Sequence, residues 1–195
     1  MDEIEVIQHC RGGDKSAFEE IYQEYAQKAL RTAFLMTNHY SLAEDAVQET
    51  FVQVWRSIHE LRDTHAFRAW FFRILVNRVS QLGKRDGKNT HLPLETAEEK
   101  PDQRSLEPED QVERNEELQR VQEAISLLPK PHRVTVILRY YSELSEAEIS
   151  ESLGIPTGTV KSRLHFARER LQEQLSKNES KHRLTGLKEK REAQE

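Results

Sequence analysis

Eight side chains between residues 157 and 168 have the chemistry that contacts with DNA require. Lysine and arginine hold phosphates and guanine edges, short hydroxyls reach phosphates and bases, and an aromatic ring can touch a thymine methyl. Val160, Leu164, Ala167 and Leu171 recur at helical spacing and supply an apolar back. The segment therefore predicts a helix whose polar, cationic side consists of Thr157, Thr159, Lys161, Ser162, Arg163, His165, Phe166 and Arg168.

A shorter helix is expected before this one, because the preceding residues carry start and stop signals. Ser145 and Glu148 form a capping box, in which each side chain accepts a hydrogen bond from a backbone N–H at the helix start. Gly154 supplies the left-handed residue that ends the helix, and Pro156 fits the start of the next. This layout predicts a helix-turn-helix with its second helix in a DNA major groove. An ordinary helical hairpin with a solvated charged face is the alternative.

The first half of the chain is predicted to contain three amphipathic helices. One runs from about Ser16 to Met36, and Tyr22 belongs to its apolar stripe. The second opens with a capping box of Ser41 and Glu44 and buries a stripe that includes Trp55. Its other face carries Asp45, Gln48, Glu49 and Gln53.

The third helix is expected from about Ala66 to Arg85, after a short polar loop, Arg62-Asp63-Thr64-His65. Arg73, Asn77, Ser80 and Lys84 follow one another at intervals of four, three and four residues and form a ridge beside aromatic side chains. Cations hold phosphates, while amides and aromatic faces suit unstacked bases of a single strand. Single-strand binding is one interpretation. The other is a solvated face beside a packed aromatic core, and Phe72 fits either.

Composition favours a helical protein of two small domains. The chain has 195 residues, 32% charged and 36% hydrophobic, with seven glycines and six prolines. We expect a helical domain at 1–90, a flexible acidic linker at 91–115, the helix-turn-helix domain at 116–176 and a frayed polar tail at 177–195. Residues 95–117 hold ten acidic and three basic side chains, so the net charge of −5 does not argue against a nucleic-acid partner.

Other features exclude several classes of site. A single cysteine, Cys10, rules out an internal disulfide and a cysteine-based zinc site. The eight histidines never lie three to five residues apart, and no catalytic or phosphate-binding motif is present, so we expect neither metal, cofactor nor enzymatic activity. Without a signal peptide or an apolar run of membrane length, the chain is expected in the cytoplasm, with no membrane insertion.

Three segments of the chain, taken in the order in which they occur, resemble the extracytoplasmic-function group of bacterial sigma factors, in the sigma-70 family. AEDAVQETFVQVW (Ala43–Trp55) is similar to the family's polymerase-binding helix, and AFRAWFFRILVNRV (Ala66–Val79) to its promoter-melting, −10-reading helix. LPKPHRVTVILRYYSELSEAEISESLGIPTGTVKSRLHFARERL (Leu128–Leu171) resembles its −35-reading domain. The match covers most of residues 14–176 outside the linker.

The resemblance implies a role for each polar cluster. It implies that Asp45, Gln48, Glu49 and Gln53 face the clamp helices of core RNA polymerase. The loop from Leu61 to His65 would hold a flipped −10 base near Asn77, on the ridge that also carries Arg73, Ser80 and Lys84. The second helix of the helix-turn-helix would contact −35 promoter DNA, where Phe166 stands in place of an arginine common in the family.

The function expected is therefore that of a transcription initiation factor. It would bind core RNA polymerase, direct it to −35/−10 promoters and help open them, and an anti-sigma factor is an expected further partner. A stand-alone helix-turn-helix regulator is the main alternative, and it leaves the ridge of the first domain without a role. A helical adaptor that binds only proteins would leave the cationic helix unexplained.

Overall fold

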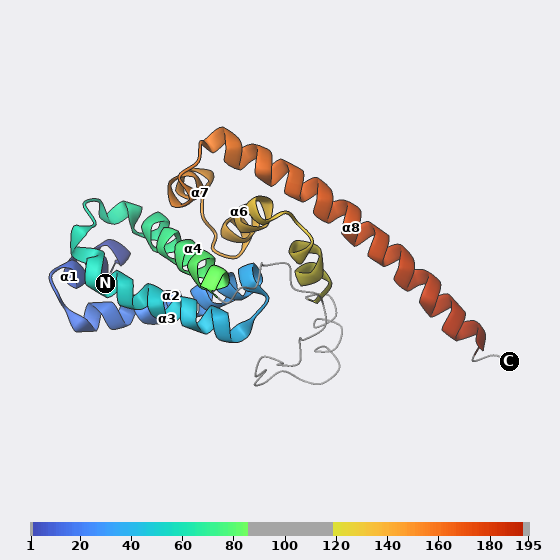
Figure 1. Cartoon of the computed structure of the whole chain (residues 1–195), viewed down its shortest axis with the longest axis horizontal. Helices are drawn as coiled ribbons and strands as arrows, with labels where there is room; N and C mark the ends of the chain where they lie inside the picture. Colours follow the sequence, from blue (N-terminus) through green and yellow to red (C-terminus); the bar gives the residue numbers. More distant parts are fainter. Residues whose placement is uncertain (1, 86–118, 193–195) are drawn as a thin grey trace.

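The computed structural model describes residues 2–85 and 119–192, with side chains as far as Ser176 (Figure 1). Within these ranges every regular element is a helix, which confirms the all-α prediction. The predicted acidic linker at 91–115 lies outside the described residues. The first half consists of α1 (Glu3–Arg11), α2 (Lys15–Thr37), α3 (Tyr40–Ser57), the short 3-10 helices η1 (Ile58–Glu60) and η2 (Thr64–Ala66), and α4 (Phe67–Arg85). The second half has a helix at 119–126, followed by α6 (Lys130–Tyr140), α7 (Glu146–Leu153) and α8 (Thr157–Glu192).

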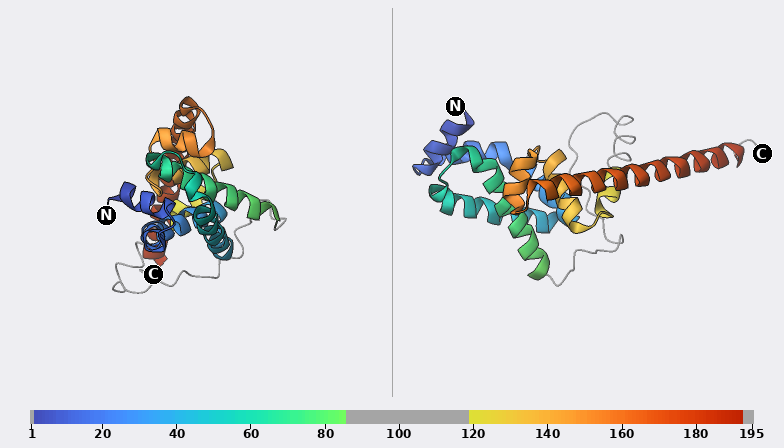
Figure 2. Two further views of the ribbon diagram at one scale, coloured as in Figure 1. Left: turned by 90° about the vertical axis from the view of Figure 1, so that its left-hand side faces the viewer. Right: turned by 90° about the horizontal axis from the view of Figure 1, so that it is seen from above.

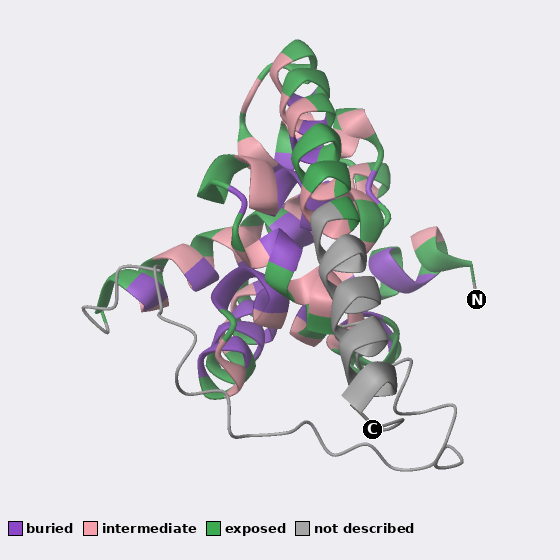
Figure 3. Cartoon of the chain, turned by 90° about the vertical axis from the view of Figure 1, so that its right-hand side faces the viewer, coloured by how far each residue is buried: buried purple, intermediate pink, exposed green. Residues whose placement is uncertain are grey.

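Aromatic side chains form the core of the first half, where α2, α3 and α4 pack together. The ring of Phe71 lies 4.9 Å from that of Tyr25 and 5.4 Å from that of Phe51, measured between centroids. Phe72 is fully buried in the same cluster. Of its two predicted roles, packing and stacking on a base, the structure therefore favours packing. Figure 3 shows buried positions along the inner sides of these helices.

The helix starts in this half differ from the prediction in two places. Helix α1 was not predicted, because nine residues with three buried side chains carry little periodicity. Helix α3 begins at Tyr40, and its first turn is capped by His39, whose Nδ1 accepts a hydrogen bond from the N–H of Leu42 at 3.3 Å. The predicted capping box of Ser41 and Glu44 is therefore wrong. Asn38 ends α2 in the left-handed conformation, so the turn is short and Ser41 already lies inside the helix.

The predicted capping box and glycine turn of the helix-turn-helix are confirmed. The Ser145 N–H donates to the Glu148 carboxylate at 2.7 Å, and the Glu148 N–H donates to the Ser145 hydroxyl at 3.2 Å. Gly154 has φ +63° and ends α7, while the N–H of Ile155 donates back to the carbonyl of Ser150. The chain then enters α8 at once. Capping and the glycine turn thus fix the angle between the two helices.

Helix α8 is much longer than expected. It continues to Glu192, although a frayed tail was predicted from residue 177 onward (Figure 2). Residues of high helix propensity prevail beyond Ser176 and no proline interrupts them, so backbone hydrogen bonding can continue. None of the described helices combines the length and the apolar character needed to cross a membrane.

Candidate nucleic-acid and protein interfaces

The first turns of α8 separate an apolar back from a polar front. Val160, Leu164 and Ala167 are buried against the rest of the second half, as predicted. The front is exposed at Thr157, Lys161, Ser162, His165 and Arg168, while Thr159 and Arg163 are half-buried. This arrangement leaves the front free to enter a groove while packing holds the helix in place.

The longer side chains of the polar front make exposed contacts with neighbouring residues. Lys161 Nζ lies 3.9 Å from Glu146 Oε2, and His165 Nε2 lies 3.6 Å from Glu169 Oε1. Arg168 Nε donates to the hydroxyl of Tyr140 at 2.8 Å. Exposed contacts of this kind contribute little to stability, so Lys161 and Arg168 can exchange their partners for phosphates at small cost.

Phe166 differs from its predicted position on the polar front. Its ring is half-buried and packs against His132 of α6, with 4.3 Å between the centroids. The guanidinium of Arg170 lies over the ring at 5.5 Å. Burial lowers the pKa of His132, and the nearby Arg163 lowers it further, which favours the neutral imidazole. In this conformation, Phe166 joins α8 to α6.

The loop before α4 is only partly available to a ligand. Leu61, predicted to help hold a base, lies between η1 and η2 and is buried in the core. Arg62, Asp63 and His65 are exposed, and Thr64 is half-buried. Asp63 Oδ1 accepts a hydrogen bond from the N–H of His65 at 2.9 Å, which fixes the shape of the loop.

The residues predicted to form a polar ridge all lie on α4, as their spacing indicated. Arg73, Asn77 and Lys84 are exposed, and Ser80 is half-buried. The neighbouring Phe71 and Phe72 are fully buried, so stacking on a base would need a different ring. Trp70 is half-buried and packs near Phe67, with 6.0 Å between the centroids.

The polar face of α3 divides into two parts. Asp45 and Gln48 are exposed. Glu49 and Gln53 are half-buried and both face Arg78 of α4, whose Nη1 lies 3.6 Å from Glu49 Oε2 and whose Nη2 donates to Gln53 Oε1 at 3.1 Å. Asp45 and Gln48 therefore face solvent, while Glu49 and Gln53 join α3 to α4.

A groove between α2 and α3 was missed by the sequence analysis. It has a volume of about 990 Å³, and Asp45 and Gln48 lie on its border. Tyr22 and Trp55, predicted to be buried, are 50% and 37% exposed there, and Val52 is 45% exposed. Helical periodicity marks an apolar face but does not say whether another element covers it. Exposed aromatic and aliphatic side chains in one groove favour a protein partner.

Comparison with known proteins now identifies the family. Residues 21–88 match the family model described as sigma-70 region 2, and residues 118–171 match sigma-70 region 4. The chain is 32% identical over 176 residues to the ECF RNA polymerase sigma factor SigW of Bacillus subtilis, covering 87% of this chain and 94% of that protein. This chain belongs to the extracytoplasmic-function sigma factors. The ECF RNA polymerase sigma-E factor of Haemophilus influenzae is 31% identical over 179 residues, covering 87% and 93%.

Two solved structures share the fold. CnrH, determined with the cytosolic domain of CnrY, superposes with a TM-score of 0.67 at 22% identity, covering 89% of this chain and 97% of that one. RpoE of Bartonella quintana, determined with the anti-sigma factor NepR, gives 0.61 at 25% identity, covering 81% and 98%. The present sigma factor is thus a transcription initiation factor that directs RNA polymerase to promoters, and the stand-alone regulator is not favoured.

Proposed function

We propose that this sigma factor reads the −35 element with the exposed front of α8. The observation that carries this assignment is the separation on that helix between the buried Val160, Leu164 and Ala167 and the exposed polar residues. Lys161, Ser162 and His165 are the candidates for base edges, because they lie on the exposed front close to the N-terminus of α8. Arg163 and Arg168 suit phosphates at its flanks.

The −10 element is assigned to the loop before α4 and to the ridge that follows. Arg62, Thr64 and His65 offer hydrogen-bonding groups to a flipped base, and Asn77 offers an amide on the next helix. Flipping costs a few kcal/mol of stacking, which the hydrogen bonds of the pocket must offset. Arg73 and Lys84 provide the cations that hold the adjoining phosphates, with Ser80 between them.

Core RNA polymerase is assigned to the groove between α2 and α3. Asp45 and Gln48 would contact the clamp helices directly, beside the exposed Tyr22, Val52 and Trp55. Such a mixture of apolar centre and polar rim is typical of protein interfaces. Glu49 and Gln53 would act at the edge of this contact and, through Arg78, keep α4 in register with the bound helix.

An anti-sigma factor is the further partner that we propose. RpoE of Bartonella quintana was determined in complex with NepR, and the present chain shares its fold over nearly all of that protein. We also place the action of the sigma factor in the cytoplasm, where the polymerase works, and assign the chemistry of RNA synthesis wholly to the polymerase.

Run-off transcription tests the function directly. Purified core enzyme would be mixed with this chain and with sheared genomic fragments, and the 5′ ends of the transcripts would be sequenced. We expect a small set of start sites that share −35 and −10 sequences, and no such set with core enzyme alone. Tight, specific binding of the same DNA by the pure chain in a gel shift, with no transcript, would support a stand-alone regulator instead.

A further inference from the structure

Helix α1 precedes the residues that match sigma-70 region 2, and none of the roles proposed above involves it. It packs on α2 and also contacts both η1 and η2, which flank the loop assigned to the −10 base. The buried side chains of α1 and those on either side of the loop belong to one core: Val6, Ile7 and Cys10 of α1, with Ile58, Leu61 and Phe67. The loop therefore lies against α1, although the two are far apart in the sequence.

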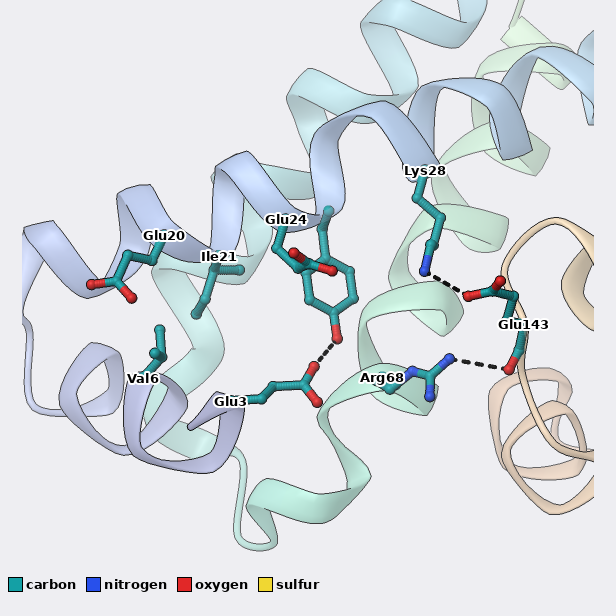
Figure 4. A pocket seen from close by; sticks show the side chains of 9 residues that line it. Glu3, Val6, Glu20, Ile21, Glu24, Lys28, Arg68 and Glu143 are labelled. Atoms are coloured by element: carbon teal, nitrogen blue, oxygen red, sulfur yellow. Dashed lines mark hydrogen bonds and ion pairs between the residues drawn. The ribbon is translucent and has the colours of Figure 1, made fainter. Parts of the chain in front are cut away.

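A polar contact holds the N-terminal end of α1 on α2 (Figure 4). The hydroxyl of Tyr25, on α2, donates a hydrogen bond to the carboxylate of Glu3, in the first turn of α1. Tyr25 is only 5% exposed, and burial together with the Glu3 contact raises the pKa of its hydroxyl, so the donor keeps its proton. A hydrogen bond to a carboxylate is stronger than one between neutral groups. Glu3 and Tyr25 thus form a specific contact between α1 and α2.

The ring of Tyr25 extends this contact to the start of α4. It meets the ring of Phe67 edge to face, with 5.4 Å between the centroids and 85° between the planes. Phe67 is 1% exposed and directly follows Ala66, the last residue of η2. Edge-to-face ring pairs have a preferred geometry. Tyr25 therefore links the start of α1, through its hydroxyl, to the end of the loop, through its ring.

Hydrogen bonds within the loop set its turns but not its place. The N–H of Leu61 donates to the carbonyl of Ile58 at 3.1 Å, and the N–H of Ala66 donates to the carbonyl of Asp63 at 3.2 Å. Each of these bonds joins residues three positions apart, so neither ties the loop to Asn77 on α4, the other side of the assigned base pocket. A recognition site has to be held to within about 0.5 Å of its working geometry. Elements packed against the loop, among them α1, have to supply that support.

We propose that α1 positions the −10 loop, and that the hydrogen bond between Tyr25 and Glu3 keeps α1 in the place where it supports the loop. Glu3 and Tyr25 are positioning residues, because they act through the packing of Leu61 and Phe67 and do not touch DNA. The proposal rests on the assignment of the loop to the −10 base. When α1 is loosened, the loop shifts relative to α4 and discriminates less well between bases.

A ratio of transcription on two templates tests the proposal in the intact chain. Both templates derive from a promoter found by the run-off assay and differ in one −10 base, at the position where the wild type discriminates most strongly. A variant that only lowers the amount of folded chain reduces both transcripts and leaves their ratio unchanged. We expect Tyr25→Phe and Glu3→Ala each to lower the ratio at least threefold, and the double variant to lower it no further, since both remove the same contact.

The conservative variant and a distant carboxylate are the controls. Glu3→Gln keeps an acceptor for the Tyr25 hydroxyl, so it should retain most of the wild-type ratio. Glu19→Ala, which removes an exposed carboxylate from α2, should leave the ratio unchanged. Binding to core polymerase in a pull-down should stay within twofold of wild type for all of these variants. A wild-type ratio in both Tyr25→Phe and Glu3→Ala would overturn the proposal.

The thiol of Cys10 gives a second readout that needs no DNA. Cys10 lies on α1 and is 1% exposed, so its reaction with Ellman's reagent reports the undocking of α1. We expect faster labelling in Tyr25→Phe and Glu3→Ala, with Glu3→Gln close to wild type. Unchanged labelling in both of the first two variants would show that the contact does not hold α1, and would overturn the proposal.

A variant in the loop itself separates this proposal from the function on which it rests. Arg62→Ala removes an exposed side chain assigned to the −10 base. If Arg62→Ala lowers the ratio and Tyr25→Phe does not, the positioning role of α1 is wrong and the assignment of the loop stands. If neither Arg62→Ala nor exchange of the whole loop changes the ratio, the assignment of the loop is wrong, and the proposal for α1 falls with it.

Discussion

At the scale of single residues, the environment of each side chain on α8 sets what it can do. Lys161 is exposed on the front of α8 and has only a distant partner in Glu146. Phe166, five positions further along, is packed against His132 and is half-buried. Two residues of one helix therefore differ in what they can do, because Lys161 is free to meet a ligand while Phe166 packs α8 on α6.

Replacing Lys161 with alanine should weaken use of the −35 element. A loss of about 1–3 kcal/mol, confined to templates with an intact −35 sequence, is expected if the ammonium meets a base edge. A phosphate contact should instead lower binding on all templates and reduce the dependence on salt. Measuring open-complex formation at several salt concentrations distinguishes a contact with a base from a contact with a phosphate. Lys15→Ala, which removes an exposed charge at the start of α2, is the control and should change neither the use of the −35 element nor the salt dependence.

Cys10 should be inert in the folded protein. Burial raises the pKa of its thiol to about 11, and the charge of Asp14 adds to the rise. Because the thiolate is the reactive form, only about one molecule in a thousand is ionised at pH 8. We expect negligible reaction with Ellman's reagent at pH 8 and full reaction after unfolding in guanidinium chloride. Rapid labelling of the native chain would show that α1 does not stay docked on α2.

At the level of elements, α3 forms the apolar groove with α2 and packs its other side against α4. Arg78 joins the second pair by contacting Glu49 and Gln53 together. The first pair leaves Trp55 partly uncovered, while the neighbouring Phe51 is buried. The same helix thus has one face in the core and one face partly exposed in the groove.

Trp55→Ala and Phe51→Ala should separate binding from stability. Trp55 is 37% exposed, so its loss should lower the free energy of unfolding by much less than the roughly 3–5 kcal/mol expected for a buried phenylalanine. Binding to core polymerase should nevertheless fall by tenfold or more, because exposed aromatic side chains often dominate interfaces. Urea unfolding and a pull-down with core enzyme give the two values. Normal polymerase binding by a folded Trp55→Ala chain would remove the groove from the interface.

The whole molecule adds a property that neither half has alone, which is the contact between them. Helix α7 packs on α4, and the turn before it contacts α2 through Ser142 and Glu143. Unfolding of one half should therefore remove support from the other. The two halves are expected to unfold in a coupled transition.

Ser142→Ala tests this coupling. Ser142 is fully buried and bonds to Thr32 across the interface, so its loss should cost about 1 kcal/mol. For a chain of this size, that lowers the melting temperature by roughly 2–4 °C. Differential scanning calorimetry measures the shift, and Ser41→Ala at an exposed site of α3 is the control. Equal melting temperatures for the two variants would mean that the halves do not contact each other in the free chain.

The sequence by itself determined helices α2, α3 and α4 and the helix-turn-helix, because those features depend on neighbours a few residues apart. The capping box at Ser145, the turn at Gly154 and the apolar back of α8 are local signals of this kind. The ridge on α4 also follows from spacing along one helix. Family membership followed from the order of the same segments.

Tertiary structure decided which faces are covered. The helical periodicity predicted that Trp55 and Tyr22 are buried in the core. In the described structure no helix covers them, and they line a groove instead. Leu61 and Phe166 were predicted to contact DNA. In the fold, Leu61 is buried and Phe166 packs on α6. The contact of Thr32 with Ser142 joins residues 110 positions apart. Such pairs depend on how helices pack in space, and the spacing of residues along one helix carries no information about them.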